Sequence, residues 1–163
     1  MICRRMAALG SLTTSDRGSI AGVAVPYERY SSPIGNEGPR TFRERIMPGA
    51  LTTDDNTAMY VQHDRTGVPL ARVGAGTLEF EESDDGLRFR ASLPAARSDV
   101  AEALTRGDLP GAVSIGFIVD ADDWQHMEKQ SLRDVTAGRI VELSLVTAGA
   151  YPDARGTFVP KEG

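Results

Sequence analysis

TLEFEESDDGLRFRA, residues 77–91, is the stretch of this sequence that decides its fold class. Polar and apolar residues alternate over 77–81 and again over 87–91, which is the period of a β-strand with one buried face. The pair Asp85-Gly86 lies between the two halves, and glycine readily adopts the positive φ of a tight hairpin turn. The stretch therefore predicts an antiparallel β-hairpin.

Strand-like segments recur on both sides of this hairpin. Residues 27–39 are rich in Ser, Gly and Pro and form a predicted loop after the first of them. Residues 122–138 form a predicted polar connection between the last two, with a short strand of its own around Trp124. The predicted strands are 19–25, ended by Pro26, then 41–46, 58–61, 111–120 and 139–146.

One helix is predicted after the hairpin. Ser98 is placed to cap it, Asp99 suits its first turn, and Gly107 suits its exit. Several strands with one or two helices predict a mostly β fold of the α+β class, a closed β-barrel with flanking helices. The predicted organisation is a flexible N-terminal segment at 1–18, one folded domain at 19–155 and a short C-terminal tail at 156–163.

The composition is that of a globular protein. The chain has 163 residues, 40% of them hydrophobic and 25% charged, which is enough for one domain with a core. The net charge of -5 disfavours binding of the whole protein to nucleic acid or to an anionic membrane. Residues 1–12 lack the hydrophobic run of a signal peptide, so we expect the protein to act in a cytoplasm.

Cysteine and histidine are scarce. Cys3 is the only cysteine, and His63 and His126 are the only histidines. A disulfide framework or a closed zinc site of Cys and His ligands cannot be assembled from these residues. We expect no metal and no cofactor, although counting alone does not exclude a carboxylate-rich metal site.

The segment VSIGFIV, residues 113–119, contains the first candidate for chemistry. Its alternation places the apolar residues on one strand face and Ser114 with Gly116 on the other. The missing side chain at Gly116 would leave room beside the hydroxyl for a substrate backbone. The segment is not the Gly-x-Ser-x-Gly elbow of an α/β-hydrolase, because position 112 is alanine. A serine on a polar strand face is more often structural, so this pattern alone assigns no role.

A carboxylate and a histidine accompany this serine. Glu142 lies in the middle of an apolar strand with Ser144 on the same face, and a buried carboxylate there needs a partner such as an imidazole N–H. A rim glutamate paired with an arginine is the simpler alternative. His63 ends a predicted strand and is the natural general base, whereas His126 is expected in an exposed loop. Serine, histidine and carboxylate can form a nucleophile, a base and an orienting group, but composition does not show that they meet.

The order and spacing of several segments resemble the caudovirus prohead protease family, the capsid-maturation proteases of tailed phages. The resemblance extends over about residues 19–155, and its strength lies in the series rather than in any one segment. The segments are FRERIMPGA (42–50), QHD (62–64), GTL (76–78), DGL (85–87), RGDLPGAVSIGF (106–117), Trp124, ELSLVT (142–147) and AYP (150–152).

The resemblance implies a barrel akin to herpesvirus assemblin and a serine endopeptidase. It implies that His63 is the base and Ser114 the nucleophile. Assemblins use a second histidine late in the chain, but His126 comes too early, so Glu142 is the predicted third member and Ser144 the alternative. The loop 147–150, with Ala148 and Gly149, is the predicted oxyanion hole, and a plain turn is equally compatible with its sequence.

The resemblance also implies partners and a location. The expected substrates are scaffold segments, the major capsid protein and finally the enzyme itself, inside the assembling prohead in the host bacterial cytoplasm. A homodimer is expected, with no nucleic-acid or membrane partner. Two other functions remain open at this point. A non-catalytic capsid-assembly module on the same fold would have no need of all three site residues, and a ligand-binding barrel would need an aromatic lining, whereas only 6% of the residues are aromatic.

Overall fold

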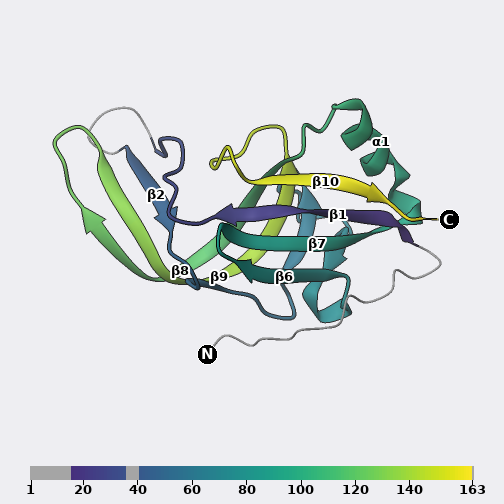
Figure 1. Cartoon of the computed structure of the whole chain (residues 1–163), viewed down its shortest axis with the longest axis horizontal. Coiled ribbons are helices and arrows are strands. Elements are labelled where there is room, and N and C mark those ends of the chain that lie inside the picture. The colour runs from purple at the N-terminus through teal and green to yellow at the C-terminus, as the bar shows by residue number, and fades with distance from the viewer. Residues whose placement is uncertain (1–15, 36–40, 163) are drawn as a thin grey trace.

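The computed structural model describes residues 16–35 and 41–162 and shows a mostly β protein (Figure 1). These residues form ten strands, one α-helix and two short 3-10 helices. In chain order they are β1 (Asp16–Pro26), β2 (Phe42–Ile46), β3 (Leu51–Thr52), β4 (Ala58–Val61), β5 (Ala71–Arg72), η1 (Val73–Ala75), β6 (Leu78–Ser83), β7 (Gly86–Pro94), η2 (Ala95–Arg97), α1 (Ser98–Arg106), β8 (Ala112–Gln125), β9 (Ser131–Val146) and β10 (Arg155–Pro160).

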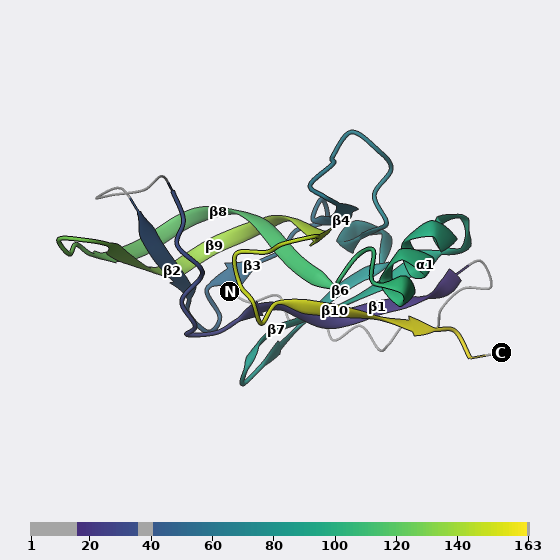
Figure 2. The same ribbon diagram turned by 90° about the horizontal axis from the view of Figure 1, so that it is seen from above.

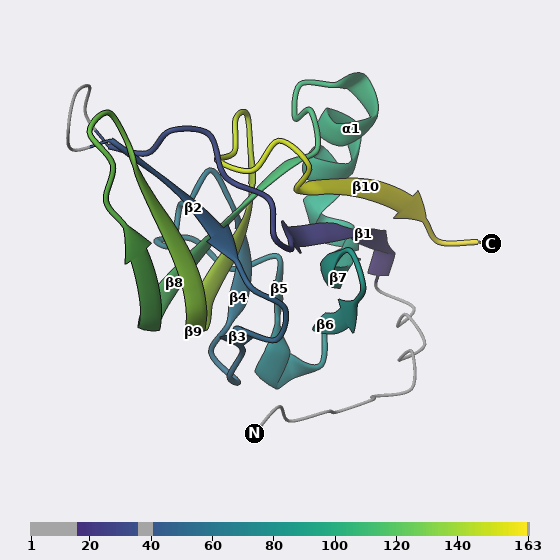
Figure 3. The ribbon, with the colours of Figure 1, turned by 60° about the vertical axis from the view of Figure 1, so that its left-hand side comes forward.

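All ten strands belong to one sheet that nearly closes into a barrel with one unsealed seam. Eight strands follow the order β5-β4-β9-β8-β10-β1-β7-β6, while β2 and β3 pair with β9. The two strands at the ends of this order are β5 and β6, and η1 connects them along the chain. At this junction the Thr77 N–H, just before β6, donates to Arg72 O of β5 at 3.2 Å. The predicted barrel is confirmed, with α1 lying outside the sheet near β10 (Figure 3).

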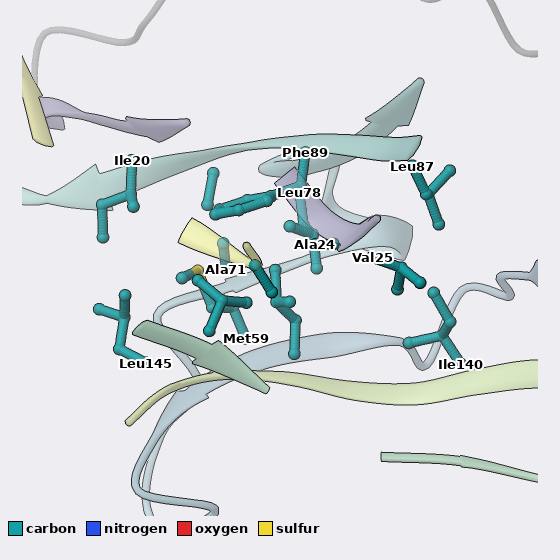
Figure 4. Close-up of a cluster of buried hydrophobic side chains, with 14 of the residues drawn as sticks. Ile20, Ala24, Val25, Met59, Ala71, Leu78, Leu87, Phe89, Ile140 and Leu145 are labelled. Atoms are coloured by element: carbon teal, nitrogen blue, oxygen red, sulfur yellow. The ribbon is translucent and has the colours of Figure 1, made fainter. Parts of the chain in front are cut away.

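The core lies between the faces of this curved sheet. Figure 4 shows apolar side chains from β1, β4, β7 and β9 that point toward one another. The predicted hairpin forms as β6 and β7, and its alternating residues Leu78, Leu87 and Phe89 are at most 4% exposed. The sequence pattern therefore located this part of the core correctly. Side chains with no exposed area include Ile20, Val25, Met59, Ile140 and Leu145.

Beyond the barrel, β8 and β9 continue as a long hairpin arm, with β2 along the other side of β9 (Figures 1 and 2). Residues 122–138 were expected to be a polar connection, and this was wrong for most of them, because β8 runs to Gln125 and β9 starts at Ser131. Register shifts between Val119 and Ala121, and between Ala121 and Asp122, interrupt the two-residue period. Many polar side chains on the arm also hide the alternation that identifies a strand.

Three other boundaries differ from the sequence-based expectation. The segment 156–163, expected to be a tail, contains most of β10, which pairs with β1 over Gly18–Val23 and with β8 at Ala112. Ser98 is not the N-cap of α1: η2 leads directly into the helix, and Ser98 has helical angles of φ -59° and ψ -23° where a cap needs an extended backbone. Of the predicted N-terminal segment 1–18, residues 1–15 lie outside the described ranges, and β1 begins at Asp16.

Candidate active site

The strand register brings the predicted site residues of β8 and β9 together. Ser114 is paired with Ser144, and Gly116 with Glu142, in the antiparallel β8–β9 ladder. Because directly paired residues project from the same face of a sheet, Ser114, Ser144 and Glu142 share one face with Gly116. Ser114 is partly buried, whereas Glu142 and Ser144 are buried.

His63 reaches the same place through a turn after β4. The Asp64 N–H donates to Val61 O at 3.0 Å, which closes a four-residue turn. Its two central residues, Gln62 and His63, have φ of 53° and 58°. Two positive φ values are typical of a type I′ turn, which usually contains Asn or Gly, and each costs a residue with a Cβ about 1–2 kcal/mol. Strain of this kind recurs at functional sites.

The turn places the imidazole of His63 against Glu142. Nδ1 of His63 hydrogen-bonds Oε1 of Glu142, and the two groups lie 79 residues apart in the sequence. The carboxylate side chain is only 8% exposed, while the imidazole is 46% exposed. Because Nδ1 is engaged, Nε2 is the ring nitrogen left to interact with a hydroxyl.

The same face carries two buried polar atoms without a protein hydrogen-bond partner. Across the part of the chain that the structure describes, these atoms are Oε2 of Glu142 and Oγ of Ser144. Almost all buried polar atoms in proteins are hydrogen-bonded, so exceptions call for a functional or structural reason. Here both exceptions lie two residues apart on β9, beside the candidate histidine.

Gly116 leaves room for the side chain of Glu142. A Cβ added at Gly116 would lie 2.8 Å from Cγ of Glu142 and 3.2 Å from its Oε1. The sequence suggested a different reason for this glycine, namely room for a substrate backbone. The structure shows that the space above it is occupied by Glu142, and contact of Gly116 with substrate stays a prediction.

The loop 147–150 packs against the peptide unit that precedes Ser114. A Cβ at Gly149 would lie 2.7 Å from Val113 O, so the loop backbone approaches β8 closely. Within residues 16–35 and 41–162, the N–H groups of Ala148 and Gly149 take part in no hydrogen bond. These N–H groups are therefore free to donate to a ligand, as the oxyanion prediction requires.

Gln62 is a residue of this region to which the sequence assigned no role. Its side-chain Oε1 accepts from the Thr147 N–H at 3.3 Å, and its Nε2 donates to Thr147 Oγ1 at 3.5 Å. The sequence shows the neighbours Gln62 and His63, but nothing in it reveals that both adopt positive φ or that Gln62 meets Thr147.

One expected contact of the site is not made. Within the described ranges no hydrogen bond joins Ser114 to His63, although such bonds often form only with substrate bound. His126 lies outside the site, as predicted: it is exposed, stacks on Trp124 at a ring-centroid distance of 5.8 Å, and contacts Ser131 Oγ through Nδ1. Among the described residues, no group of three or more His, Cys, Asp or Glu side chains could hold a metal ion.

A second buried carboxylate lies behind the loop. Glu44 on β2 accepts a hydrogen bond from the Tyr151 hydroxyl at 3.2 Å and faces Arg133 at 3.5 Å. Burial raises the pKa of Glu44 above its usual value, while Tyr151 and Arg133 oppose that shift. Burial, with the nearby Glu44, also raises the pKa of Tyr151. Glu44 is fully partnered, unlike Glu142.

Comparison with known families identifies the type of protein. The family model described as caudovirus prohead serine protease matches residues 7–162, nearly the whole chain. The chain belongs to the caudovirus prohead serine proteases. The resemblance noted from the sequence is thus confirmed, and membership of this family implies a serine peptidase of capsid maturation.

Other comparisons add no relative of this prohead protease. Searches of curated proteins and of solved structures each gave no match. In the described part of the chain, no helix combines the length and apolar character needed to cross a membrane.

Proposed function

We propose that this prohead protease cleaves scaffold segments and the major capsid protein, and then itself, with Ser114 as nucleophile, His63 as general base and Glu142 as orienting group. The observation that carries this proposal is the His63–Glu142 hydrogen bond on the sheet face that also bears Ser114. The rival function, a non-catalytic assembly module, gives no reason for a strained histidine bonded to a buried carboxylate.

In the proposed mechanism, Nε2 of His63 takes the Ser114 proton as Oγ attacks the scissile carbonyl carbon. The carbonyl oxygen becomes an oxyanion that the N–H groups of Ala148 and Gly149 stabilise. The imidazolium then protonates the leaving amine, which gives an acyl-enzyme, and water attacks it with His63 again as the base. Glu142 accepts from Nδ1–H, so it fixes the tautomer and stabilises the imidazolium.

An open sheet edge supports a peptide as substrate. Of the described residues in β8, only Ala112 pairs with β10, so the other edge of β8 has no strand partner from Ser114 onward. Unpaired N–H and C=O groups can bind an extended peptide as an added strand. A peptide bound there would run directly past the Ser114 hydroxyl. We further propose that the enzyme acts as a homodimer inside the prohead in the host bacterial cytoplasm.

The test is co-expression of the chain with its major capsid protein, followed by mass spectrometry of the capsid protein. We expect a trimmed capsid amino terminus with the wild type and an intact one with Ser114→Ala, while circular dichroism shows both folded. Equal trimming by the two chains would rule out Ser114 as the nucleophile. An intact capsid protein in both cultures would favour the assembly module.

A further inference from the structure

Gln62 lies between the base and the candidate oxyanion loop, and it contacts both. We infer that Gln62 is a positioning residue: its hydrogen bonds connect the His63 turn to the loop 147–150 and so fix the position of the base relative to the oxyanion donors. This inference rests on the proposed function, because it concerns the geometry of the same site.

Three hydrogen bonds connect Gln62 to the end of β9 and the start of the loop. The backbone N–H of Gln62 donates to Leu145 O at 2.8 Å, which extends the parallel β4–β9 pairing by one step. The side-chain amide adds two bonds to Thr147, one to its N–H and one to its hydroxyl. An amide is suited to this task because it has both a donor and an acceptor.

The backbone of the turn indicates why the side chain matters. Position 62 has a φ of 53°, a conformation in which Asn or Gly would be less strained than glutamine. Asparagine is one methylene shorter, however, and would fall short of the Thr147 contacts. A residue that fits the backbone less well but reaches the loop is expected where the side-chain contact is needed.

The loop 147–150 contacts the rest of the protein at several points, and its contact with Gln62 is the one nearest to His63. At the far end, Ala150 O accepts from the Ser32 N–H at 2.8 Å. In the middle, Gly149 packs on Val113 O, next to Ser114. At the near end, Thr147 is bonded to Gln62. Removing the Gln62 side chain would release the near end only, and the backbone bond to Leu145 would keep the turn in place.

This arrangement predicts an effect on the chemical step rather than on substrate binding. The N–H groups of Ala148 and Gly149 follow Thr147 directly. In the proposed mechanism they stabilise the negative charge on the substrate oxygen, which develops only in the transition state. A displaced loop would therefore lower kcat and leave KM nearly unchanged.

The experiment compares Gln62→Ala with Gln62→Glu, Thr147→Ala and a matched control, Gln130→Ala, whose side chain lies in the turn between β8 and β9. The substrate is a peptide that spans the capsid cleavage site found by mass spectrometry. We expect Gln62→Ala to lower kcat by about 10–100-fold with little change in KM. Gln62→Glu should keep most of the rate, because its carboxylate still accepts from the Thr147 N–H. The control should match the wild type.

The second measurement is a double-mutant cycle that combines Gln62→Ala with Thr147→Ala. Gln62 and Thr147 act through shared bonds, so the double variant should lose no more rate than Gln62→Ala alone. A wild-type kcat in Gln62→Ala, a loss confined to KM, or additive losses in the double variant would each overturn the inference. If Ser114→Ala proves as active as wild type, the proposed function fails instead.

A third measurement does not depend on activity. In wild type the Thr147 N–H is bonded to Gln62, so its hydrogen exchange should accelerate by about tenfold in Gln62→Ala. The same exchange rate at Thr147 in both proteins would refute the inference whatever the protease assay gives.

Discussion

The two halves of the β8–β9 hairpin differ in whether their buried and half-buried polar groups have hydrogen-bond partners. In the arm, Arg45 on β2 forms two bonds to Asp134 at 2.7 and 2.8 Å, and Arg133 bonds Asp122 at 2.7 Å. In the barrel half, Glu142 and Ser144 each keep a buried oxygen without a protein partner. The strands are continuous, so the difference lies in the side chains and not in the backbone.

This difference separates groups that stabilise the fold from groups available for chemistry. The ion pairs of the arm have their partners within the protein and stabilise the fold. An unsatisfied pair of atoms next to a strained histidine is tolerated at a cost in stability, which is typical of functional sites. Substitutions in the barrel half should therefore change activity, and substitutions in the arm should change stability.

The largest expected effect is that of Glu142→Gln. The amide keeps the shape but no longer fixes the imidazole tautomer or stabilises its charged form, so kcat/KM on the capsid-derived peptide should fall by roughly 10³–10⁴-fold. The melting temperature should not fall, because a buried charged group is removed. Ser144→Ala is the matched control for the alternative third member, and it should cost less than about tenfold, the worth of one neutral hydrogen bond. The reverse ranking would assign the orienting role to Ser144.

Gly116→Ala should have the next largest effect. The new methyl group would meet Cγ of Glu142 at 2.8 Å, so the carboxylate must move away from its bond to His63. We expect a loss of about 100-fold in kcat, the size associated with a displaced catalytic group. Steady-state kinetics distinguish the two reasons for this glycine, because a clash with a substrate backbone would instead raise KM.

In the arm, Asp134→Asn should destabilise the protein without affecting peptide cleavage. The bonds from Arg45 lower the pKa of Asp134, so the folded state binds its proton less tightly than the unfolded state. The stabilisation is present above the unfolded pKa of about 4 and is lost as the pH falls through the folded value. Denaturant titration at pH 7 should show a loss of about 1–2 kcal/mol. Wild-type and variant stability curves that stay parallel down to acid pH would contradict this assignment.

The smallest effect is expected for Glu44→Gln, and its pH dependence has the opposite sign. Because burial raises the pKa of Glu44, wild-type stability decreases as the pH rises from the unfolded pKa through the folded one. Glutamine can still accept from the Tyr151 hydroxyl, so the variant should be about 0.5–1 kcal/mol more stable at pH 7. This gain should shrink in acid. A variant that is less stable at pH 7 would show that Arg133 outweighs the cost of burial.

The sequence predicted the barrel more completely than it predicted the arm. The β6–β7 hairpin and the exit of α1 at Gly107, whose φ is 87°, follow from local patterns that the tertiary structure does not override. Ser114, Glu142 and His63 were chosen by residue type and by resemblance, and the structure brings Glu142 to His63 and places Ser114 on the same face.

What the sequence could not supply depends on three-dimensional register. The outer parts of β8 and β9 were missed because their bulges and polar faces erase the alternation. Strand β10 was missed because its partner β1 lies at the other end of the chain. The contact of Gly116 with Glu142 depends on the register of β8 against β9, and the contacts of Gln62 with Thr147 depend on the register of β4 against β9.

The position of β10 also has a consequence for biosynthesis. The ribosome makes this strand after the other nine, yet it lies between β1 and β8, and the Val113 N–H donates to Ala154 O just before it. The barrel therefore cannot close until β10 has been added: β1 can pair with β7 early, but its other edge must wait for a partner about 140 residues downstream. A nascent chain that lacks β10 has His63, Ser114 and Glu142 but not the closed barrel that supports them, so the proposed site would be completed only at the end of synthesis.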